Sequence, residues 1–303
     1  MIYHTPALLD ESIEGLKIRP DGIYVDVTFG GGGHSRAILE RLTTGRLLAL
    51  DQDADALANA PDDEHLIIER GNFRFLRNYL VHHGYRQVDG ILADLGVSSH
   101  HFDEAERGFS FQHDAPLDMR MNTAGQRTAK DIINQYPENR LRKIFVQYGE
   151  LPNASRLARQ IAGARQTAVI ESSGQLIDAI GRCIPRGTEN KYLAKVFQAL
   201  RIEVNNELES LKTLLMQAVD LLPEGGRLAI ITYHSLEDRL VKNFFKNGMF
   251  EGSAEKDIYG NMKVPFRQVN NRVIVPTDEE ITANSRVRSA KLRIGEKLDF
   301  LNC

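Results

Sequence analysis

An unbroken run of four glycines, Gly30 to Gly33, lies just beyond the aliphatic segment Ile23–Thr28. Glycine backbone is favoured where a strand turns sharply into a helix or where another molecule approaches the main chain. The dinucleotide fingerprint G-x-G-x-x-G, counted from Gly30, requires a glycine where Ser35 stands, and no P-loop lysine follows. The run therefore predicts a strand–turn–helix unit at a binding edge of an α/β sheet, and it argues against a nicotinamide or flavin dinucleotide. A tight turn with a purely structural role is the alternative.

Short aliphatic runs alternate with helical patterns over the first hundred residues. The expected strands are Ile23–Thr28, Arg46–Asp51, Leu66–Glu69 and Val88–Asp94, and the expected helices are Ser35–Leu42, Asp55–Ala60 and Phe73–His82. This alternation is typical of βαβ units, so we expect an α/β fold with a mostly parallel sheet.

A long helical block then interrupts the alternation. Nearly every segment between residues 128 and 222 has the helical period, with helix-start signals at Thr128 and Asn153. Afterwards we expect strands at Arg227–Thr232, Arg272–Val275 and Ala290–Ile294, a helix at Glu237–Asn247, and a loop over Glu251–Gln268. The sequence thus predicts a sheet domain in two parts, residues 1–104 and 206–303, with an inserted all-helical domain, residues 105–205, for substrate recognition.

Composition narrows the class of protein. A chain of 303 residues with 42% hydrophobic residues can bury a full core, and its net charge of -3 gives no overall positive field for a polyanion. Cys183 and Cys303 form no C-x-x-C motif, which disfavours a disulfide framework or a zinc site. Acidic residues in the first sixteen positions argue against a signal peptide, and no apolar run could span a bilayer, so we expect a cytoplasmic protein without a membrane partner.

One local basic cluster stands out near the C-terminus. Its members fall within a dozen residues and are Arg286, Arg288, Lys291, Arg293 and Lys297. The cluster indicates either a surface that binds nucleic-acid phosphates or a solvated strand edge.

Chemically suited side chains follow three of the expected strands. Asp51 ends the second strand about twenty residues beyond the glycine run, where a carboxylate can accept hydrogen bonds from both ribose hydroxyls of a nucleoside. Asp53 is a competing candidate, although a helix N-cap is its more ordinary role. Phe73 could lie against an adenine or pack in the core, and Asp94 ends the fourth strand. A ligand without phosphate but with a polar amino-acid moiety, such as S-adenosylmethionine, suits this set.

Eight sequence blocks in order along nearly the whole chain resemble the bacterial 16S ribosomal RNA cytosine-N4 methyltransferases. The blocks are Tyr3-His4-Thr5-Pro6 with Leu8-Leu9, Asp26-x-Thr28-Phe29-Gly30-Gly31-Gly32-Gly33-His34-Ser35, Asp94-Leu95-Gly96-Val97-Ser98-Ser99, Glu106-Arg107-Gly108-Phe109-Ser110-Phe111, Pro116-Leu117-Asp118-Met119-Arg120-Met121, Phe197-Gln198-Ala199-Leu200-Arg201-Ile202, Tyr233-His234-Ser235-Leu236-Glu237-Asp238-Arg239 and Arg286-x-Arg288-Ser289-Ala290-Lys291-Leu292-Arg293.

This resemblance implies a class I, Rossmann-like methyltransferase fold with a mostly parallel seven-stranded sheet and an inserted helical domain. It implies S-adenosylmethionine as methyl donor and, as acceptor, a decoding-centre cytidine of 16S rRNA in the small ribosomal subunit. The cofactor contacts carried over by motif are Gly32, Gly33, His34, Asp51, Phe73, Asp94 and His101. The family commonly has proline and glutamine where this chain has His100 and His101, so the contact at His101 is altered or made by backbone atoms.

The chemistry of N4 methylation sets what the site must do. Cytosine N4 is a poor nucleophile, so the site has to position it against the donor methyl group and accept the amino hydrogens. Asp94 is the candidate catalytic acceptor, and Phe109 or Tyr233 could stack on the base. Two roles remain open for His234: it could relay a proton, or it could belong to a helix start that is capped by Ser235. Carbon-5 methylation would need a thiolate, and neither cysteine lies in a matching block.

Basic residues in the inserted block offer a clamp for the RNA backbone or an ordinary charged helical surface. They are Arg107, Arg120, Arg186, Lys191, Lys195 and Arg201. Two other functions stay open: a methyltransferase acting on a small molecule or a protein, and a ribosome-assembly factor that binds the cofactor without turnover.

Overall fold

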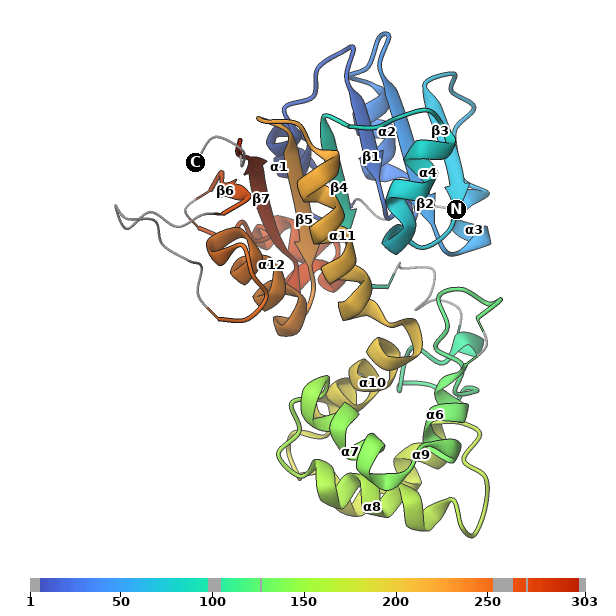
Figure 1. Ribbon diagram of the computed structural model, residues 1–303. Helices are drawn as coiled ribbons and strands as arrows, with labels where there is room; N and C mark the ends of the chain where they lie inside the picture. The colour runs from blue at the N-terminus through green and yellow to red at the C-terminus, as the bar shows by residue number, and fades with distance from the viewer. Residues whose placement is uncertain (1–5, 98–104, 126, 253–263, 271, 300–303) are drawn as a thin grey trace. The chain divides into compact units, whose positions relative to one another are not determined.

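The computed structural model describes residues 6–97, 105–125, 127–252, 264–270 and 272–299 (Figure 1). The chain divides into two compact units, Met1–Gly96 with Leu208–Cys303 and Val97–Glu207. The first unit is built on a β-sheet and has a hydrophobic cluster on each face of that sheet. The second unit is helical and has a hydrophobic core of its own.

The sheet has seven strands in the order β3-β2-β1-β4-β5-β7-β6. Neighbours among the first five strands pair in parallel, whereas β7 is antiparallel to both β5 and β6. The strands are β1 (Ile23–Asp26), β2 (Arg46–Asp51), β3 (Leu66–Arg70), β4 (Gly90–Asp94), β5 (Arg227–Thr232), β6 (Phe266–Gln268) and β7 (Lys291–Lys297). The predicted α/β class and mostly parallel sheet are confirmed.

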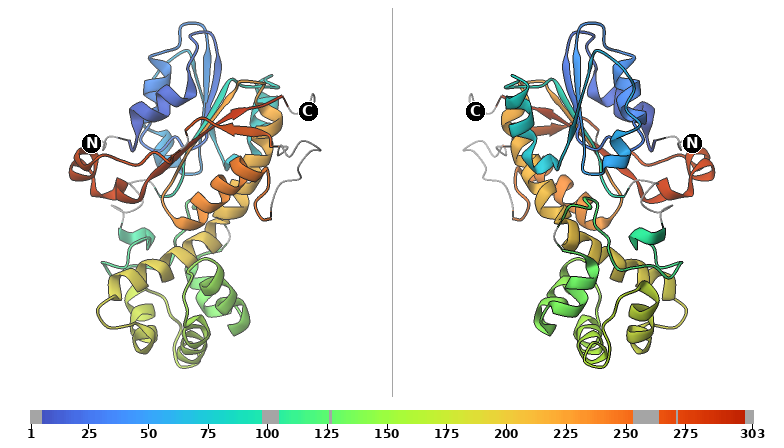
Figure 2. Two further views of the ribbon diagram at one scale, coloured as in Figure 1. Left: turned by 90° about the vertical axis from the view of Figure 1, so that its left-hand side faces the viewer. Right: turned by 90° about the vertical axis from the view of Figure 1, so that its right-hand side faces the viewer.

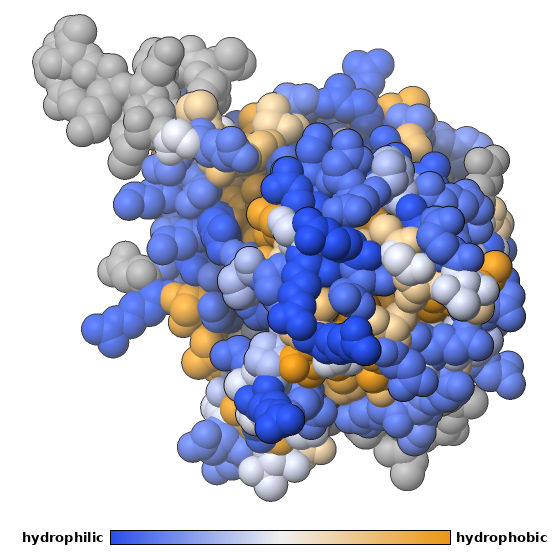
Figure 3. All heavy atoms as spheres, turned by 90° about the horizontal axis from the view of Figure 1, so that it is seen from below, coloured by the Kyte–Doolittle hydropathy of each residue, from blue (hydrophilic) through white to orange (hydrophobic). Residues whose placement is uncertain are grey.

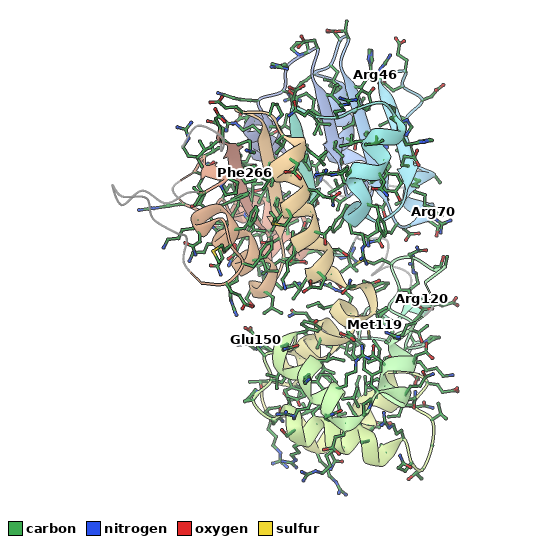
Figure 4. All side chains as sticks on the ribbon, in the orientation of Figure 1. Arg46, Arg70, Met119, Arg120, Glu150 and Phe266 are labelled. Atoms are coloured by element: carbon green, nitrogen blue, oxygen red, sulfur yellow. The ribbon has the colours of Figure 1, made fainter. Side chains whose placement is uncertain are left out.

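The sheet has one point where the order of its strands reverses. From β1 the chain proceeds to β2 and β3 on one side, and then returns to place β4 on the other side of β1. Ligands of open α/β sheets bind beyond the carboxyl ends of the strands at such a point. Figure 4 labels Arg46 at the amino end of β2 and Arg70 at the carboxyl end of the neighbouring β3, so the two labels mark the opposite ends of these parallel strands.

Helices cover both faces of the sheet (Figure 2). On one face the core contains Val25, Leu50 and Ile91 from the strands, together with residues of α4, α11 and α12. On the other face Tyr24, Leu47 and Leu92 pack with residues of α1 and α2. The alternation arises because successive strand residues point to opposite faces. The helices of this unit are α1 (Leu9–Leu16), α2 (Gly33–Leu39), α3 (Ala54–Leu57), η1 (Phe73–Phe75), α4 (Leu76–His82), α11 (Glu207–Leu221), α12 (Ser235–Asn247), α13 (Asp278–Ala283) and η4 (Ser285–Ser289).

Two expectations about the last strands are wrong. The segment predicted as a loop, Glu251–Gln268, ends in β6, because Phe266 is fully buried against Phe244 and Phe245 and brings its strand to the edge of β7. The predicted strand Arg272–Val275 makes only an isolated bridge between Ile274 and Leu292. Pro276 follows directly and has no N–H with which to extend the pairing.

The second unit is helical and packs around its own core. Thr128 is the N-cap of α6 and forms a capping box with Asp131, so that start signal is confirmed. Asn153 precedes α8, but its side chain binds Tyr192 and the carbonyl of Cys183 instead of capping the helix. The elements are η2 (Ala105–Arg107), α6 (Ala129–Gln135), α7 (Glu138–Gln147), α8 (Ala154–Ala164), α9 (Ser173–Ile180), η3 (Gly181–Cys183) and α10 (Glu189–Asn205). Among the residues described, no helix is both long and apolar enough to cross a membrane.

Candidate active site

The glycine run forms the turn between β1 and α2. Gly30 and Gly32 have positive φ, +52° and +75°, which favours glycine at both positions. The N–H of Gly30 donates to Oδ2 of Asp51 at 2.8 Å. A Cβ atom on Gly32 would lie 2.6 Å from the ring of Phe29, and one on Gly33 would collide with Pro6. The turn therefore requires these glycines for internal reasons, whatever it binds.

Asp26, the last residue of β1, accepts hydrogen bonds from residues on both sides of the glycine run. It is buried, and its carboxylate accepts hydrogen bonds from the Ser35 hydroxyl at 2.7 Å and the Thr28 N–H at 3.0 Å. Burial raises the pKa of Asp26 to about 6, against the lowering effect of these donors. Asp26 is not among the predicted site residues, although it ends a strand shortly before the glycine run.

Asp94 ends β4, next to β1 at the point of strand reversal. Its Oδ1 accepts a 2.9 Å hydrogen bond from the hydroxyl of Tyr233, and its backbone N–H donates to Oγ1 of Thr28 at 2.6 Å. Burial raises the pKa of Asp94 to about 7, and the charges of Asp26 and Glu237 raise it further while the Tyr233 hydrogen bond lowers it. A carboxyl group with this pKa can take up and release a proton near neutral pH.

His34 faces the same carboxyl group from the start of α2. Its Nε2 lies 3.2 Å from the carbonyl oxygen of Ala7, which can only accept, so Nε2 carries the proton. Burial lowers the pKa of His34 to about 4. The ring is therefore neutral at neutral pH, and its Nδ1, 3.9 Å from Oδ2 of Asp94, forms no ion pair there.

The remaining predicted residues of the sheet unit end β2 or follow β3. Asp51 accepts N–H bonds from Gly30 and Asp53, which orients its carboxylate toward the glycine turn. Asp53 is the N-cap of α3 and accepts from the N–H of Asp55, as predicted. Phe73 begins η1 and is partly buried against the hydrophobic core.

The residues proposed for base stacking and proton relay have other contacts. Tyr233 directs its hydroxyl at Asp94, and burial together with the Asp94 charge raises the pKa of Tyr233 well above its usual value. His234 is the N-cap of α12 and forms a capping box with Glu237. The predicted helix start is therefore present, but the prediction that Ser235 caps it is wrong. Phe109 is buried in the core of the helical unit. His100 and His101 lie outside the described residues.

Part of each basic cluster is engaged within the protein. Arg293 and Lys291 bind Asp238 at 2.7 Å and 3.4 Å, and Lys297 binds the carbonyl of Leu298. Arg286 and Arg288 are exposed. In the helical unit the guanidinium groups of Arg107, Arg120 and Arg201 bind backbone carbonyls or carboxylates of that unit, whereas Arg186 and Lys191 are exposed. The face of the molecule drawn in Figure 3 is mainly hydrophilic, with small hydrophobic areas.

The sheet order, the antiparallel β7 and the glycine turn beside acids at the ends of β1, β2 and β4 define the fold and site of a class I methyltransferase. A family model described as the MraW methylase family matches residues 1–298. The chain belongs to this family, which confirms the methyltransferase family predicted from the sequence blocks.

Curated relatives match over nearly their full length. The ribosomal RNA small subunit methyltransferase H of Bacteroides fragilis is 58% identical over 296 residues, 97% of each chain. The protein with the same name in Parabacteroides distasonis is 57% identical over 298 residues, 98% of each chain. Among solved structures, an rRNA methylase from Streptococcus thermophilus covers 99% of both chains at 13% identity, with a TM-score of 0.44.

Proposed function

We propose that this methyltransferase transfers a methyl group from S-adenosylmethionine to N4 of a decoding-centre cytidine in 16S rRNA, on the small ribosomal subunit in the cytoplasm. The relatives named above support an rRNA substrate. The observation that carries the proposal is the Asp94 carboxyl group, with a pKa raised to about 7, at the carboxyl end of β4 beside the glycine turn.

The residues at the strand ends fit the cofactor. Asp51 ends β2, and backbone N–H groups of Gly30 and Asp53 hold its carboxylate beside the glycine turn, where a carboxylate can accept hydrogen bonds from ribose hydroxyls. Phe73 is the proposed contact for the adenine. Gly32, Gly33 and His34, with Asp94, are proposed to contact the rest of the cofactor, and His101 keeps its proposed role from the family motif. When bound, the cofactor supplies an electrophilic methyl group on its sulfonium.

Asp94 is the proposed catalytic residue. Its Oδ1 is held by Tyr233, which leaves Oδ2, on the side of His34, to accept a hydrogen bond from the amino group of the cytosine. This hydrogen bond would orient N4 toward the methyl group, and the raised pKa of Asp94 suits uptake of the proton that N4 loses. His34, neutral because burial lowers its pKa, adds no competing positive charge.

Two surfaces are proposed for the RNA. The exposed Arg286 and Arg288 would contact phosphates, as would Arg186 and Lys191 in the inserted helical domain, residues 105–205. Phosphate contacts fix the register of a nucleic acid but carry no sequence information, so the choice of cytidine depends on the unstacked base itself.

The test is methyl transfer from labelled S-adenosylmethionine to small ribosomal subunits from a strain that lacks the modification, followed by nucleoside mass spectrometry. We expect N4-methylcytidine at one site. Asp94→Asn should abolish the product, and Asp62→Asn, an exposed acid outside the site, should keep it. Methyl groups in metabolites or protein would support a different acceptor class, and cofactor binding without any acceptor would support an assembly factor.

A further inference from the structure

Three potential metal ligands meet on the sheet unit, outside the site described above. Glu69 lies in β3, His82 is the last residue of α4 and His83 is its C-cap. One ligand atom from each residue can be chosen so that all three lie within 4.8 Å of one another. The side chains of Glu69 and His83 are 26% and 24% exposed, and His82 is exposed, so a dissolved ion can reach the cluster.

The backbone at the end of α4 brings the two histidines together. Consecutive residues of a continuing helix point about 100° apart. His83 departs from helical geometry, with φ −91° and ψ 9°, and Gly84 follows with φ +81°. The two imidazole centroids lie 4.9 Å apart as a result. Backbone hydrogen bonds from His83 to Tyr79 and from Gly84 to Val81 fix this turn before any ligand arrives.

The donor set has the chemistry of a transition-metal site. Two imidazole nitrogens and one carboxylate oxygen are ligands that zinc takes in proteins, with water completing the coordination. In the structure Nε2 of His83 lies 2.7 Å from Oε1 of Glu69, a hydrogen-bond distance. Zinc–ligand bonds of about 2.0–2.1 Å separate tetrahedral ligand atoms by roughly 3.4 Å. The cluster therefore reaches metal geometry through modest rotations of Glu69 and the exposed His82.

We propose that Glu69, His82 and His83 form a binding site for a divalent transition-metal cation, for which zinc is the natural probe. The ion would replace the Glu69–His83 hydrogen bond and join the end of α4 to β3. Because β3 is an edge strand that, within the described part of the sheet, pairs with β2 alone, such a bridge would restrain the strand that leads to Asn72 and Phe73. This site is independent of the proposed methyl-transfer reaction.

The test uses full-length protein without a histidine tag, freed of metal by a chelator and titrated with zinc chloride in a calorimeter. We expect one zinc ion per chain. His82→Ala leaves the Glu69–His83 contact intact, and Glu69→Gln keeps its size and an acceptor oxygen, so both variants should fold. Each should bind zinc at least about tenfold more weakly. At the same zinc concentration, the Tm of the parent protein should rise more than that of His82→Ala.

His113→Ala is the matched control, since His113 is exposed in the helical unit, and all variants keep both cysteines. It should bind zinc as the parent does. The proposal is overturned if the parent binds no zinc, if Glu69→Gln and His82→Ala retain its affinity, or if His113→Ala weakens binding equally. In the first two cases the cluster is an ordinary ion pair with a neighbouring histidine.

Discussion

The hydroxyl of Tyr233 donates a 2.9 Å hydrogen bond to Oδ1 of Asp94, which joins the residue after β5 to the last residue of β4. Glu237 holds the tyrosine in place, because its Oε2 accepts the N–H of Tyr233 at 2.9 Å. Asp94 is thus oriented by a neutral donor, not by a cation. Tyr233 is a positioning residue that lowers the pKa of Asp94 against the effect of burial.

Tyr233→Phe should displace the pH profile of methyl transfer. Loss of the hydroxyl removes an influence that lowers the pKa of Asp94, so that pKa rises further above its folded value of about 7. At saturating substrate the acid limb of the rate profile should move to higher pH, and the rate at neutral pH should fall. Tyr85→Phe, at a partly buried tyrosine that packs against the core of the same unit, is the control. An unmoved acid limb in Tyr233→Phe would separate Asp94 from the proton step.

Asp94→Asn should stabilise the fold at alkaline pH while it removes activity. The pKa of Asp94 is about 7 in the folded protein, where the group is buried, and 3.8 when it is solvated. Ionisation of the buried carboxyl group therefore costs stability, and the cost is complete above pH 7. This cost disappears as pH falls through both values. Urea unfolding should show the variant more stable by about 4 kcal/mol near pH 8, with the difference falling close to zero near pH 4. A constant difference across that range would contradict the raised pKa.

Asp51→Ala should lose cofactor affinity, and Asp53→Ala should not. Calorimetry with S-adenosylhomocysteine should show binding weakened by about tenfold or more in Asp51→Ala, since charged hydrogen bonds contribute about 1.5–3 kcal/mol each. Asp53 is the N-cap of α3, so its replacement by alanine should cost about 1 kcal/mol of stability with unchanged affinity. Normal binding by Asp51→Ala would refute the ribose contact.

Arg288→Ala should reduce the salt dependence of RNA binding. If the exposed Arg288 neutralises one phosphate, the slope of log affinity against log salt should decrease by about 1, with cofactor affinity unchanged. Arg293→Ala should instead destabilise the fold, because it leaves the carboxylate of Asp238 without its 2.7 Å partner. Equal slopes for the parent and Arg288→Ala, from binding isotherms at several salt concentrations, would remove Arg288 from the RNA surface.

Among the strands, those that are buried on both faces were predicted most accurately. The predicted bounds of β2 and β5 match the structure because each is a continuous aliphatic run between clear breaks. The strand β6 was missed because it has three residues and only Phe266 among them is buried. A strand that is held in the sheet by one buried side chain shows no alternation of apolar and polar residues in its sequence.

The candidate site was predictable where a residue's role depends on its own strand. Asp51 and Asp94 follow from the rule that ligands gather at the carboxyl ends of strands. The bond between Tyr233 and Asp94 was not predictable, because it requires the pairing of β4 with β5 across a long insertion. The cap at His234 was missed because histidine is not among the usual N-cap residues.

The insertion between β4 and β5 also determines the order in which a nascent chain can fold. Gly90 of β4 pairs with Arg227 of β5, so the central sheet acquires its fifth strand only after the whole helical unit has been synthesised. The helical unit has its own core of mostly local helices, which form quickly. On the translating ribosome, the edge of β4 that later pairs with β5 therefore stays unpaired while the insert is synthesised and folds. Mutations that slow the insert should consequently reduce the yield of the sheet unit before they affect its stability.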